Sequence, residues 1–176
     1  MSNSSKSARS KHKSSVETPA GQSAPTRFPW PPVIALIAGV TAYVLGRFLT
    51  PLAILPASFV PVLAAFGWLL VVMGLGLDLL AMWTLHRHGT TVSPMHGSAK
   101  LVTSGPYRIS RNPIYLGNTI ILIGLGFAFN NFWFPILAVL AGFAVTKLQI
   151  IPEERYLAAR FGKSWRHYSK RISRWF

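Results

Sequence analysis

The residues best suited to chemistry lie in one stretch, Leu101-Val-Thr-Ser-Gly-Pro-Tyr-Arg-Ile-Ser-Arg-Asn-Pro-Ile-Tyr-Leu-Gly117. Arg108 and Arg111, with the free backbone N–H groups at the start of a following helix, would attract a carboxylate or a phosphate. Tyr107 and Tyr115 can stack on an aromatic ring or a cation. Each feature is more often structural when taken singly, but their combination indicates a functional site.

Acidic residues number only 4, and their positions are informative. Glu153 and Glu154 follow Pro152, which is typical of the first turn of a helix. Asp78 lies inside an apolar run, where a carboxylate usually pairs or functions. Lys147 lies at a similar depth in a later apolar run, so a packing ion pair between Asp78 and Lys147 is favoured over a catalytic Asp78.

Other kinds of site find little support. The chain has no cysteine, which excludes disulfides, thiol nucleophiles and cysteine metal sites. His86, His88 and His96 fall close together, and the His-x-His pair could suggest a metal site. A third ligand to complete such a site is not obvious, so we expect no bound metal. The sequence also contains no phosphate-binding glycine loop, dinucleotide fingerprint or nucleophile motif.

The composition indicates a small membrane protein. Of the 176 residues, 51% are apolar and only 12% are charged, about half the charge of an average soluble domain. The formal net charge is +14. The basic residues flank apolar runs instead of forming one patch, which argues against a nucleic-acid-binding domain.

Four apolar runs are long enough to cross a bilayer, which takes about 17 to 25 residues. We therefore predict an all-α integral membrane protein with about four transmembrane helices. The predicted spans are residues 33–49, 59–85, 112–129 and 132–151. Asn112 can cap the third helix, Pro113 suits its first turn, and Asn130-Asn131 makes the third and fourth helices an antiparallel hairpin.

The regions outside the spans are basic. Residues 1–27 are rich in Ser, Lys and Arg and are predicted to be a disordered tail beside anionic lipid; residues 28–176 form the membrane domain. Residues 152–172 have one apolar, aromatic face and predict a basic amphipathic helix at the membrane interface, broken or bent at Gly162. All 18 Lys and Arg residues except Arg47 fall on one side of the four spans, so both termini are predicted to be cytoplasmic.

Two blocks of this sequence together resemble a known family. The first is Gly-Pro-Tyr-Arg-x-x-Arg-Asn-Pro-x-Tyr-x-Gly at residues 105–117. The second, one helical hairpin later, is Glu-Glu-x-x-Leu-x-x-x-Phe-Gly at residues 153–162, followed by Tyr168. In this order and spacing they closely resemble the isoprenylcysteine carboxyl methyltransferase family, to which membrane phospholipid methyltransferases are related. The resemblance covers roughly residues 60 to 172.

The resemblance implies an enzyme that binds S-adenosylmethionine at its cytoplasmic face. The family's cofactor pocket falls on Lys100, Leu101, Val102, Tyr107, Asn112, Pro113, Ile114, Tyr115 and Glu153. Asn112 stands where the best-known members have His, and Asn can still form hydrogen bonds. Tyr107 lines the pocket, and Glu153 accepts hydrogen bonds from the polar groups of the cofactor.

The substrate position departs from the family pattern. Where the best-known members have Arg four residues before the first Glu, this sequence has Gln149. Lys147 is a candidate substitute, but it would point to a different side of the helix. Both residues are candidates for contacts with the methyl acceptor, which is expected to be lipidic or amphiphilic and to enter from the bilayer.

Methyl transfer from a sulfonium is an in-line displacement that needs orientation and a dry pocket more than acid–base help when the acceptor is an anion. An amine acceptor would have to lose a proton, for which Glu154 or a tyrosine such as Tyr107 is the candidate. Carboxyl O-methylation is the leading prediction, with N-methylation of a phospholipid headgroup as the alternative. A non-catalytic membrane protein that binds anionic lipid is the alternative outside enzymes, and a nicotinamide-dependent reductase lacks a visible signature.

Overall fold

The computed structural model describes residues 30–89 and 101–176, and within these residues the chain is all-helical, without a strand. The predicted fold class is therefore confirmed. The long helices are α1 (Trp30–Val44), α2 (Val60–Arg87), α3 (Pro113–Ala128), α4 (Trp133–Val145) and α5 (Ile151–Arg171). Short π-helical turns extend α1 over Leu45–Leu49 and join α4 to α5 over Thr146–Ile150, and 3₁₀ turns cover Ala57–Phe59 and Gly105–Arg108.

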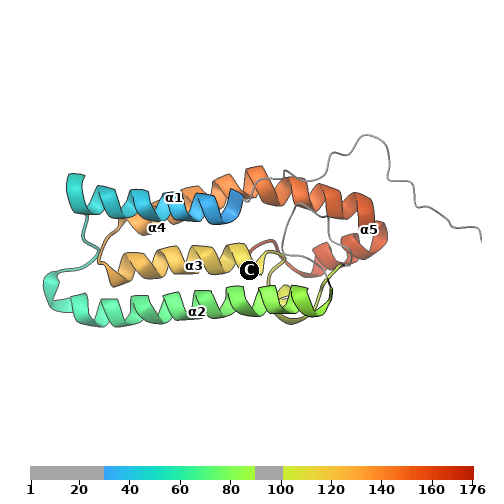
Figure 1. Cartoon of the computed structure of the whole chain (residues 1–176), viewed down its shortest axis with the longest axis horizontal. Helices are drawn as coiled ribbons and strands as arrows, with labels where there is room; N and C mark the ends of the chain where they lie inside the picture. The colour runs from blue at the N-terminus through green and yellow to red at the C-terminus, as the bar shows by residue number, and fades with distance from the viewer. Residues whose placement is uncertain (1–29, 90–100) are drawn as a thin grey trace, which may run out of the picture.

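Four of the helices run side by side, and α3 lies in the middle (Figure 1). It packs against α2 on one side and against α4 on the other, and α1 packs mainly on α4. The start of α1, the end of α2, the start of α3 and the end of α4 lie at the same end of the bundle, and α5 extends beyond it (Figure 1). This end carries the segments singled out from the sequence.

Glycines allow α2 and α3 to approach each other closely. Gly67 faces Gly124 and Gly74 faces Gly117, so both helices repeat the small residue after seven positions. A Cβ on Gly67 would lie 2.6 Å from the Gly124 carbonyl oxygen, and one on Gly74 would lie 2.8 Å from the Gly117 oxygen. In a lipid environment, where no hydrophobic driving force acts between helices, small residues favour helix association because they let the backbones approach closely.

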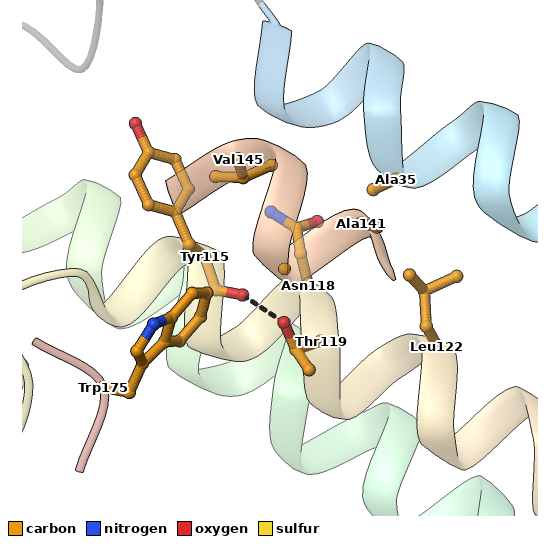
Figure 2. A pocket seen from close by; sticks show the side chains of 9 residues that line it. Ala35, Tyr115, Asn118, Thr119, Leu122, Ala141, Val145 and Trp175 are labelled. Carbon is orange, nitrogen blue, oxygen red and sulfur yellow. Dashed lines mark hydrogen bonds between the residues drawn. The ribbon is translucent and has the colours of Figure 1, made fainter. Parts of the chain in front are cut away.

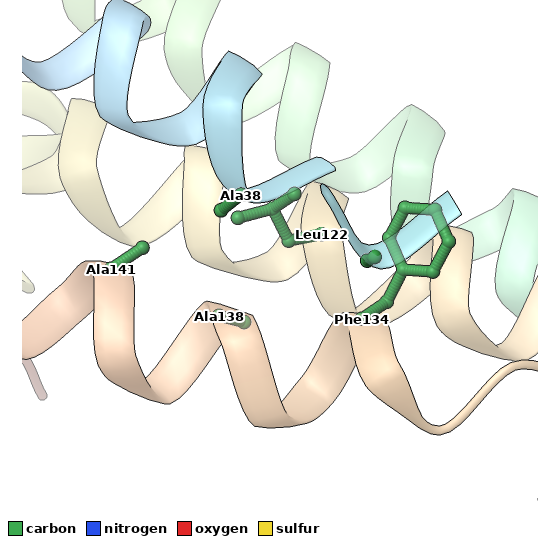
Figure 3. Packing of buried hydrophobic residues seen from close by; sticks show 6 residues of the cluster. Ala38, Leu122, Phe134, Ala138 and Ala141 are labelled. Carbon is green, nitrogen blue, oxygen red and sulfur yellow. The ribbon is translucent and has the colours of Figure 1, made fainter. Parts of the chain in front are cut away.

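Alanines do the same between α1 and α4. Ala42 and Ala138 are fully buried, and Ala38 and Ala141 are nearly so. Together with Leu122 of α3 and Phe134 near the start of α4, these alanines form a buried apolar cluster between α1, α3 and α4 (Figure 3).

The outer surface of the helices is apolar. Most of the exposed large hydrophobic side chains lie on α1, α2 and α4. Three helical segments are long and apolar enough to cross a membrane: Pro32–Leu49, Ala57–Arg87 and Trp133–Arg171. The shorter apolar helix α3 is enclosed by the others, and its length of about 24 Å approaches the hydrocarbon thickness of about 30 Å.

The loops at the other end are joined by asparagines. The Asn130 side chain accepts hydrogen bonds from the backbone N–H groups of Ile54 and Leu55 at 2.9 and 3.0 Å, and donates one to the Leu55 carbonyl at 2.9 Å. Asn131 donates to the Ala42 carbonyl at 3.0 Å. The predicted hairpin between the third and fourth apolar helices is confirmed. The Asn130 bonds tie it to the connection between α1 and α2, and the Asn131 bond ties it to α1 itself.

Pro152 lies in the first turn of α5 with Glu153 and Glu154, as expected. The helix does not begin afresh there, because the backbone is already helical through the π turn Thr146–Ile150. The π turn widens the helix just before Pro152, where a proline would otherwise clash with the preceding turn.

One expectation from the sequence is wrong. The expected ion pair between Asp78 and Lys147 is absent from the described residues: α3 separates α2 from α4, Asp78 lies against Gly117, and the Lys147 ammonium lies 5.6 Å from the Phe143 ring.

Candidate functional site

One hydrogen bond joins the two sequence blocks that are 38 residues apart. The Tyr115 hydroxyl, in the first turn of α3, donates to the Glu153 Oε2 atom in the first turn of α5 at 3.3 Å. The two side chains come together because the turn at 130–131 folds α4 back along α3 (Figure 1). The fold thus places a tyrosine and a carboxylate from the two blocks in contact.

The second half of α5 returns to the first block because the helix bends at Gly162. This residue has φ 50° and ψ −114°, a conformation that glycine tolerates and side-chain-bearing residues rarely adopt. Beyond the bend, the Tyr168 hydroxyl donates to the Tyr107 carbonyl oxygen at 2.8 Å. The predicted bend is confirmed, and it adds Tyr168 and the buried Trp165 to the site.

Glu154 is held by two guanidinium groups. Its Oε1 atom lies 2.9 Å from Arg111 Nη1, and Arg174 binds the same carboxylate in bidentate fashion at 3.1 and 2.7 Å. Arg111 also lies over the Trp165 ring at 5.7 Å. Bidentate arginine–carboxylate pairs fix geometry strongly, so holding these segments together suits Glu154 better than the proton transfer expected from the sequence.

Residues 172–176 follow α5 and dock on the first block. The Arg174 carbonyl oxygen accepts hydrogen bonds from Ser110 Oγ at 3.1 Å and Asn112 Nδ2 at 3.0 Å. The Ser173 carbonyl oxygen accepts from the Arg111 N–H at 3.0 Å. Three consecutive residues of the first block are therefore bonded to one short segment.

Asn112 stands at the predicted N-terminal boundary of α3, with Pro113 in the first turn as expected. Its side chain makes no capping hydrogen bond, however. The expectation of a side-chain cap is wrong because the Asn112 amide is used instead to hold the Arg174 carbonyl. The amide oxygen of Asn112 is the part of this side chain left for a ligand.

Apolar residues line the first block. Val102 and Pro113 are buried, and Leu101 and Ile114 are partly buried. Leu101 and Ile114 thus keep some accessible apolar surface, the kind on which a flat ring can rest, whereas Val102 and Pro113 pack behind them. Lys100, the remaining predicted cofactor residue, lies outside the described residues.

The two candidate acceptor residues point in different directions. Gln149 is 1% exposed, and its Oε1 atom has no hydrogen-bond partner among the described residues. Lys147 is exposed on the outside of the π turn. The expected difference in direction is confirmed, and Gln149 is the one that faces the interior, four residues before Glu153.

Burial shifts the pKa values of Glu153 and Tyr107, which lie outside the apolar helix α4 at the end of the bundle that carries the site. It raises the pKa of Glu153 to about 6, an effect that the Tyr115 hydrogen bond opposes and the neighbouring Glu154 carboxylate reinforces. Burial, with the nearby Glu153 carboxylate and Tyr168, raises the pKa of Tyr107 above its usual value. Glu153 is thus mostly ionised at neutral pH, and the Tyr107 hydroxyl stays protonated, which makes it a poor base.

A pocket lies beside Tyr115, between α1, α3 and α4 (Figure 2). It is small and partly open to the surroundings, and its cavity volume of about 20 Å³ is enough for about one water molecule. Its walls are mostly apolar, with Trp175 of the docked segment beside Tyr115 (Figure 2). The lining residues are Ala35, Tyr115, Asn118, Thr119, Leu122, Ala141, Gly142, Val145 and Trp175.

The histidines of the 86–96 stretch gather no metal-binding group where the structure describes them. His88 Nδ1 lies 2.8 Å from the Thr84 carbonyl oxygen, and its Nε2 lies 3.3 Å from Ser104 Oγ. Across residues 30–89 and 101–176, three or more metal-ligating side chains nowhere come together. His96 lies outside the described residues.

No sequence motif marks the residues that build the back of the site, which are Ser110, Arg174 and Trp175. Arg111 stands out in the sequence only as a residue that attracts anions. The anion that it binds is Glu154 of the same chain. The composition does indicate such a pairing: the chain has only 4 acidic residues and 18 basic ones. A carboxylate next to an apolar span is expected to be paired with a cation.

Comparison with known proteins gives one finding that bears on this site. The family model described as phospholipid methyltransferase matches residues 62–164. The match spans both sequence blocks and includes Tyr107, Asn112, Tyr115 and Glu153. A search of curated proteins found no significant match to the chain.

Proposed function

Because the chain belongs to the phospholipid methyltransferase family, and is therefore a membrane methyltransferase, we propose that it uses S-adenosylmethionine to methylate a lipidic acceptor. The observation that carries the proposal is the Tyr115–Glu153 hydrogen bond, which joins the two family blocks at one end of the bundle. The cofactor residues are those predicted from the resemblance, with Lys100 added from the sequence alone.

The residues present suit this cofactor. Glu153 offers a carboxylate to cationic and hydroxyl groups, the Asn112 amide oxygen offers an acceptor, and Leu101 and Ile114 offer apolar surface to a ring. S-adenosylmethionine, when bound, supplies an electrophilic methyl group on a cationic sulfur. The chain supplies binding, orientation and exclusion of water, which is most of what an in-line displacement needs.

The acceptor supported best is the amine of a phospholipid headgroup. Gln149 stands where a carboxylate-binding arginine would be expected; it carries no positive charge to neutralise a carboxylate, and its buried Oε1 atom can accept a hydrogen bond from an amine. Arg111 and Arg174 do not offer a free cation in place of that arginine, because both bind Glu154. An amine must also lose a proton, and Glu153 is the unpaired carboxylate of the described site that can take it.

Carboxyl O-methylation of a prenylcysteine-like acceptor is the second candidate. It is favoured by the close resemblance of residues 105–117 and 153–162 to the blocks of the isoprenylcysteine enzymes. Its active site needs no base, because a carboxylate and a sulfonium lose charge together in the transition state.

The two candidates give chemically different products. Purified chain, tritiated S-adenosylmethionine and mixed micelles that contain either phosphatidylethanolamine or a prenylcysteine distinguish them. We expect the label in an N-methyl group that survives alkaline hydrolysis. Label that is released as methanol by alkali would instead establish O-methylation, and no transfer to either acceptor, from a chain that binds the cofactor, would exclude both.

The orientation is part of the proposal. We propose that the end of the bundle that carries Glu153 faces the cytoplasm, since all Lys and Arg residues except Arg47 fall on that side of the spans. The acceptor then needs only to move within its leaflet to present its headgroup to Tyr115 and Glu153. Its hydrocarbon chains remain among the apolar helices.

A further inference from the structure

We propose that Glu154 and Arg174 are positioning residues for the cofactor site. Their ion pair holds residues 172–176, the docked segment, on the first block, and the docked segment sets the direction of the Asn112 amide. The inference rests on the proposed function, because it assigns the Asn112 amide oxygen to S-adenosylmethionine. It also goes beyond the family match, which covers residues 62–164 and does not reach Arg174.

The Asn112 amide has one favourable direction beside the docked segment. Its Nδ2 atom donates to the Arg174 carbonyl oxygen at 3.0 Å. Because a carbonyl oxygen can only accept a hydrogen bond, the amide must turn its nitrogen toward Arg174 and its own oxygen elsewhere. That oxygen receives no hydrogen bond within the described residues. It is therefore held ready to accept one from a hydroxyl or ammonium group of the cofactor.

A buried serine fixes the same arrangement from behind. Ser110 is fully buried. Its hydroxyl donates to the Arg174 carbonyl oxygen at 3.1 Å and accepts from the Asn112 backbone N–H at 3.1 Å. Asn112 is thus connected to this carbonyl twice, through its own amide and through the Ser110 hydroxyl. A shift of the docked segment would break both connections and leave the direction of the amide unset.

The Glu154 carboxylate supplies the charged contact that holds the docked segment. Arg174 Nε and Nη2 lie 3.1 and 2.7 Å from its two oxygens, a bidentate geometry that is strong and directional. Arg111 binds the same carboxylate at 2.9 Å, and its backbone N–H donates to the Ser173 carbonyl at 3.0 Å. The Glu154 side chain is only 15% exposed, so salt and water screen these contacts weakly.

The binding of S-adenosylmethionine in detergent, measured by calorimetry, tests the inference. Glu154→Gln and Arg174→Gln should each raise the Kd roughly tenfold, the effect expected when one hydrogen bond to a ligand is misdirected. Arg174→Lys should raise it less, because the charge is kept and only the bidentate geometry is lost. The double Gln variant should bind no more weakly than either single variant, since both substitutions break the same pair.

Steady-state kinetics adds a readout that loss of stability would not give. The KM for S-adenosylmethionine should rise in Glu154→Gln, while the kcat at saturating cofactor and the KM for the lipid stay near their original values. This split is expected when a group that binds the cofactor equally well before and during the reaction is lost.

Two control variants separate positioning from stability. Arg155→Gln removes an exposed cation next to Glu154 and should change neither the Kd nor the thermal midpoint. Gly67→Ala crowds α2 against α3 away from the site and should lower the midpoint without raising the Kd of the folded chain. If Glu154→Gln behaves like Gly67→Ala, with a lower midpoint and an unchanged Kd, the positioning role is ruled out.

A further readout needs no cofactor. Hydrogen exchange of peptides that contain Arg111 reports on its N–H group, which is bonded to Ser173 of the docked segment. We expect faster exchange in Glu154→Gln than in the unchanged chain or in Arg155→Gln, and equal exchange would refute the holding role of Glu154. Absence of cofactor binding by the unchanged, folded chain would overturn the proposed function, whereas binding that Glu154→Gln retains in full would overturn this inference alone.

Discussion

At the scale of single residues, two adjacent glutamates have different surroundings and so different roles. Glu154 is neutralised by Arg111 and Arg174, whereas Glu153 accepts a hydrogen bond from the Tyr115 hydroxyl and forms no ion pair within the described residues. The sequence showed both as acids in the first turn of a helix. It could not show which of them is paired, because the partner Arg174 lies 20 residues away and reaches Glu154 only after α5 bends at Gly162.

The raised pKa of Glu153 predicts that cofactor binding weakens in acid. Burial holds this pKa at about 6, so the carboxylate that accepts hydrogen bonds is lost as the pH falls through that value. The association constant for S-adenosylmethionine should drop roughly tenfold between about pH 7.5 and pH 5, since one pH unit below the pKa leaves about a tenth of the group ionised. Calorimetric titration at a series of pH values measures it.

The same pKa shift means that the weaker cofactor binding in acid is not caused by unfolding through Glu153. A carboxyl group whose pKa rises from 4.5 to about 6 on folding stabilises the fold below pH 4.5, and this stabilisation is lost as the pH rises through 6. Acid therefore weakens binding through Glu153 without weakening the fold through it. Glu153→Gln should remove the pH dependence of binding, and an equally steep dependence in that variant would refute the assignment.

At the scale of helices, the sequence predicted the positions of all four apolar segments to within a few residues. The length of the apolar runs and the Pro and Asn residues that interrupt them were sufficient for this. The pairing of helices was harder to foresee, and the expected Asp78–Lys147 ion pair was wrong because α3 lies between α2 and α4. The glycines that put α3 next to α2 were visible in the sequence, but their seven-residue repeat becomes meaningful only once the two helices are known to face each other.

The glycine contacts predict that α2 and α3 tolerate no added methyl group. In Gly67→Ala the new Cβ would lie 2.3 Å from the Ala128 backbone nitrogen and 2.6 Å from the Gly124 carbonyl oxygen. These are backbone atoms that cannot rotate away, so we expect a loss of roughly 1–3 kcal/mol, as in overpacked cores. Gly76→Ala on the same helix is the matched control, because nothing lies within 4 Å of its Cβ.

Thermal unfolding in detergent, followed by circular dichroism, compares the two alanine variants with the unchanged chain. The midpoint should fall in Gly67→Ala and stay near the original in Gly76→Ala. Equal midpoints for all three proteins would mean that α2 and α3 do not approach each other as described.

At the scale of the whole molecule, charge and apolar length indicated a membrane protein, and the methyltransferase family match at residues 62–164 agrees with this. The parts that the sequence did not foresee are those made by distant contacts. One is the unbroken helix from α4 through the π turn into α5, and the other is the docking of residues 172–176 on Ser110 and Asn112. Both depend on where the chain returns in space, which local patterns do not encode.

The cofactor assignment is tested by the binding of S-adenosylmethionine to the purified chain in detergent, measured by isothermal calorimetry beside Glu153→Ala and the control Gly76→Ala. We expect saturable binding with a Kd that is roughly micromolar, lost in Glu153→Ala and kept in Gly76→Ala. Absence of binding by the unchanged chain, shown by circular dichroism to be folded, would contradict the assignment of S-adenosylmethionine as cofactor.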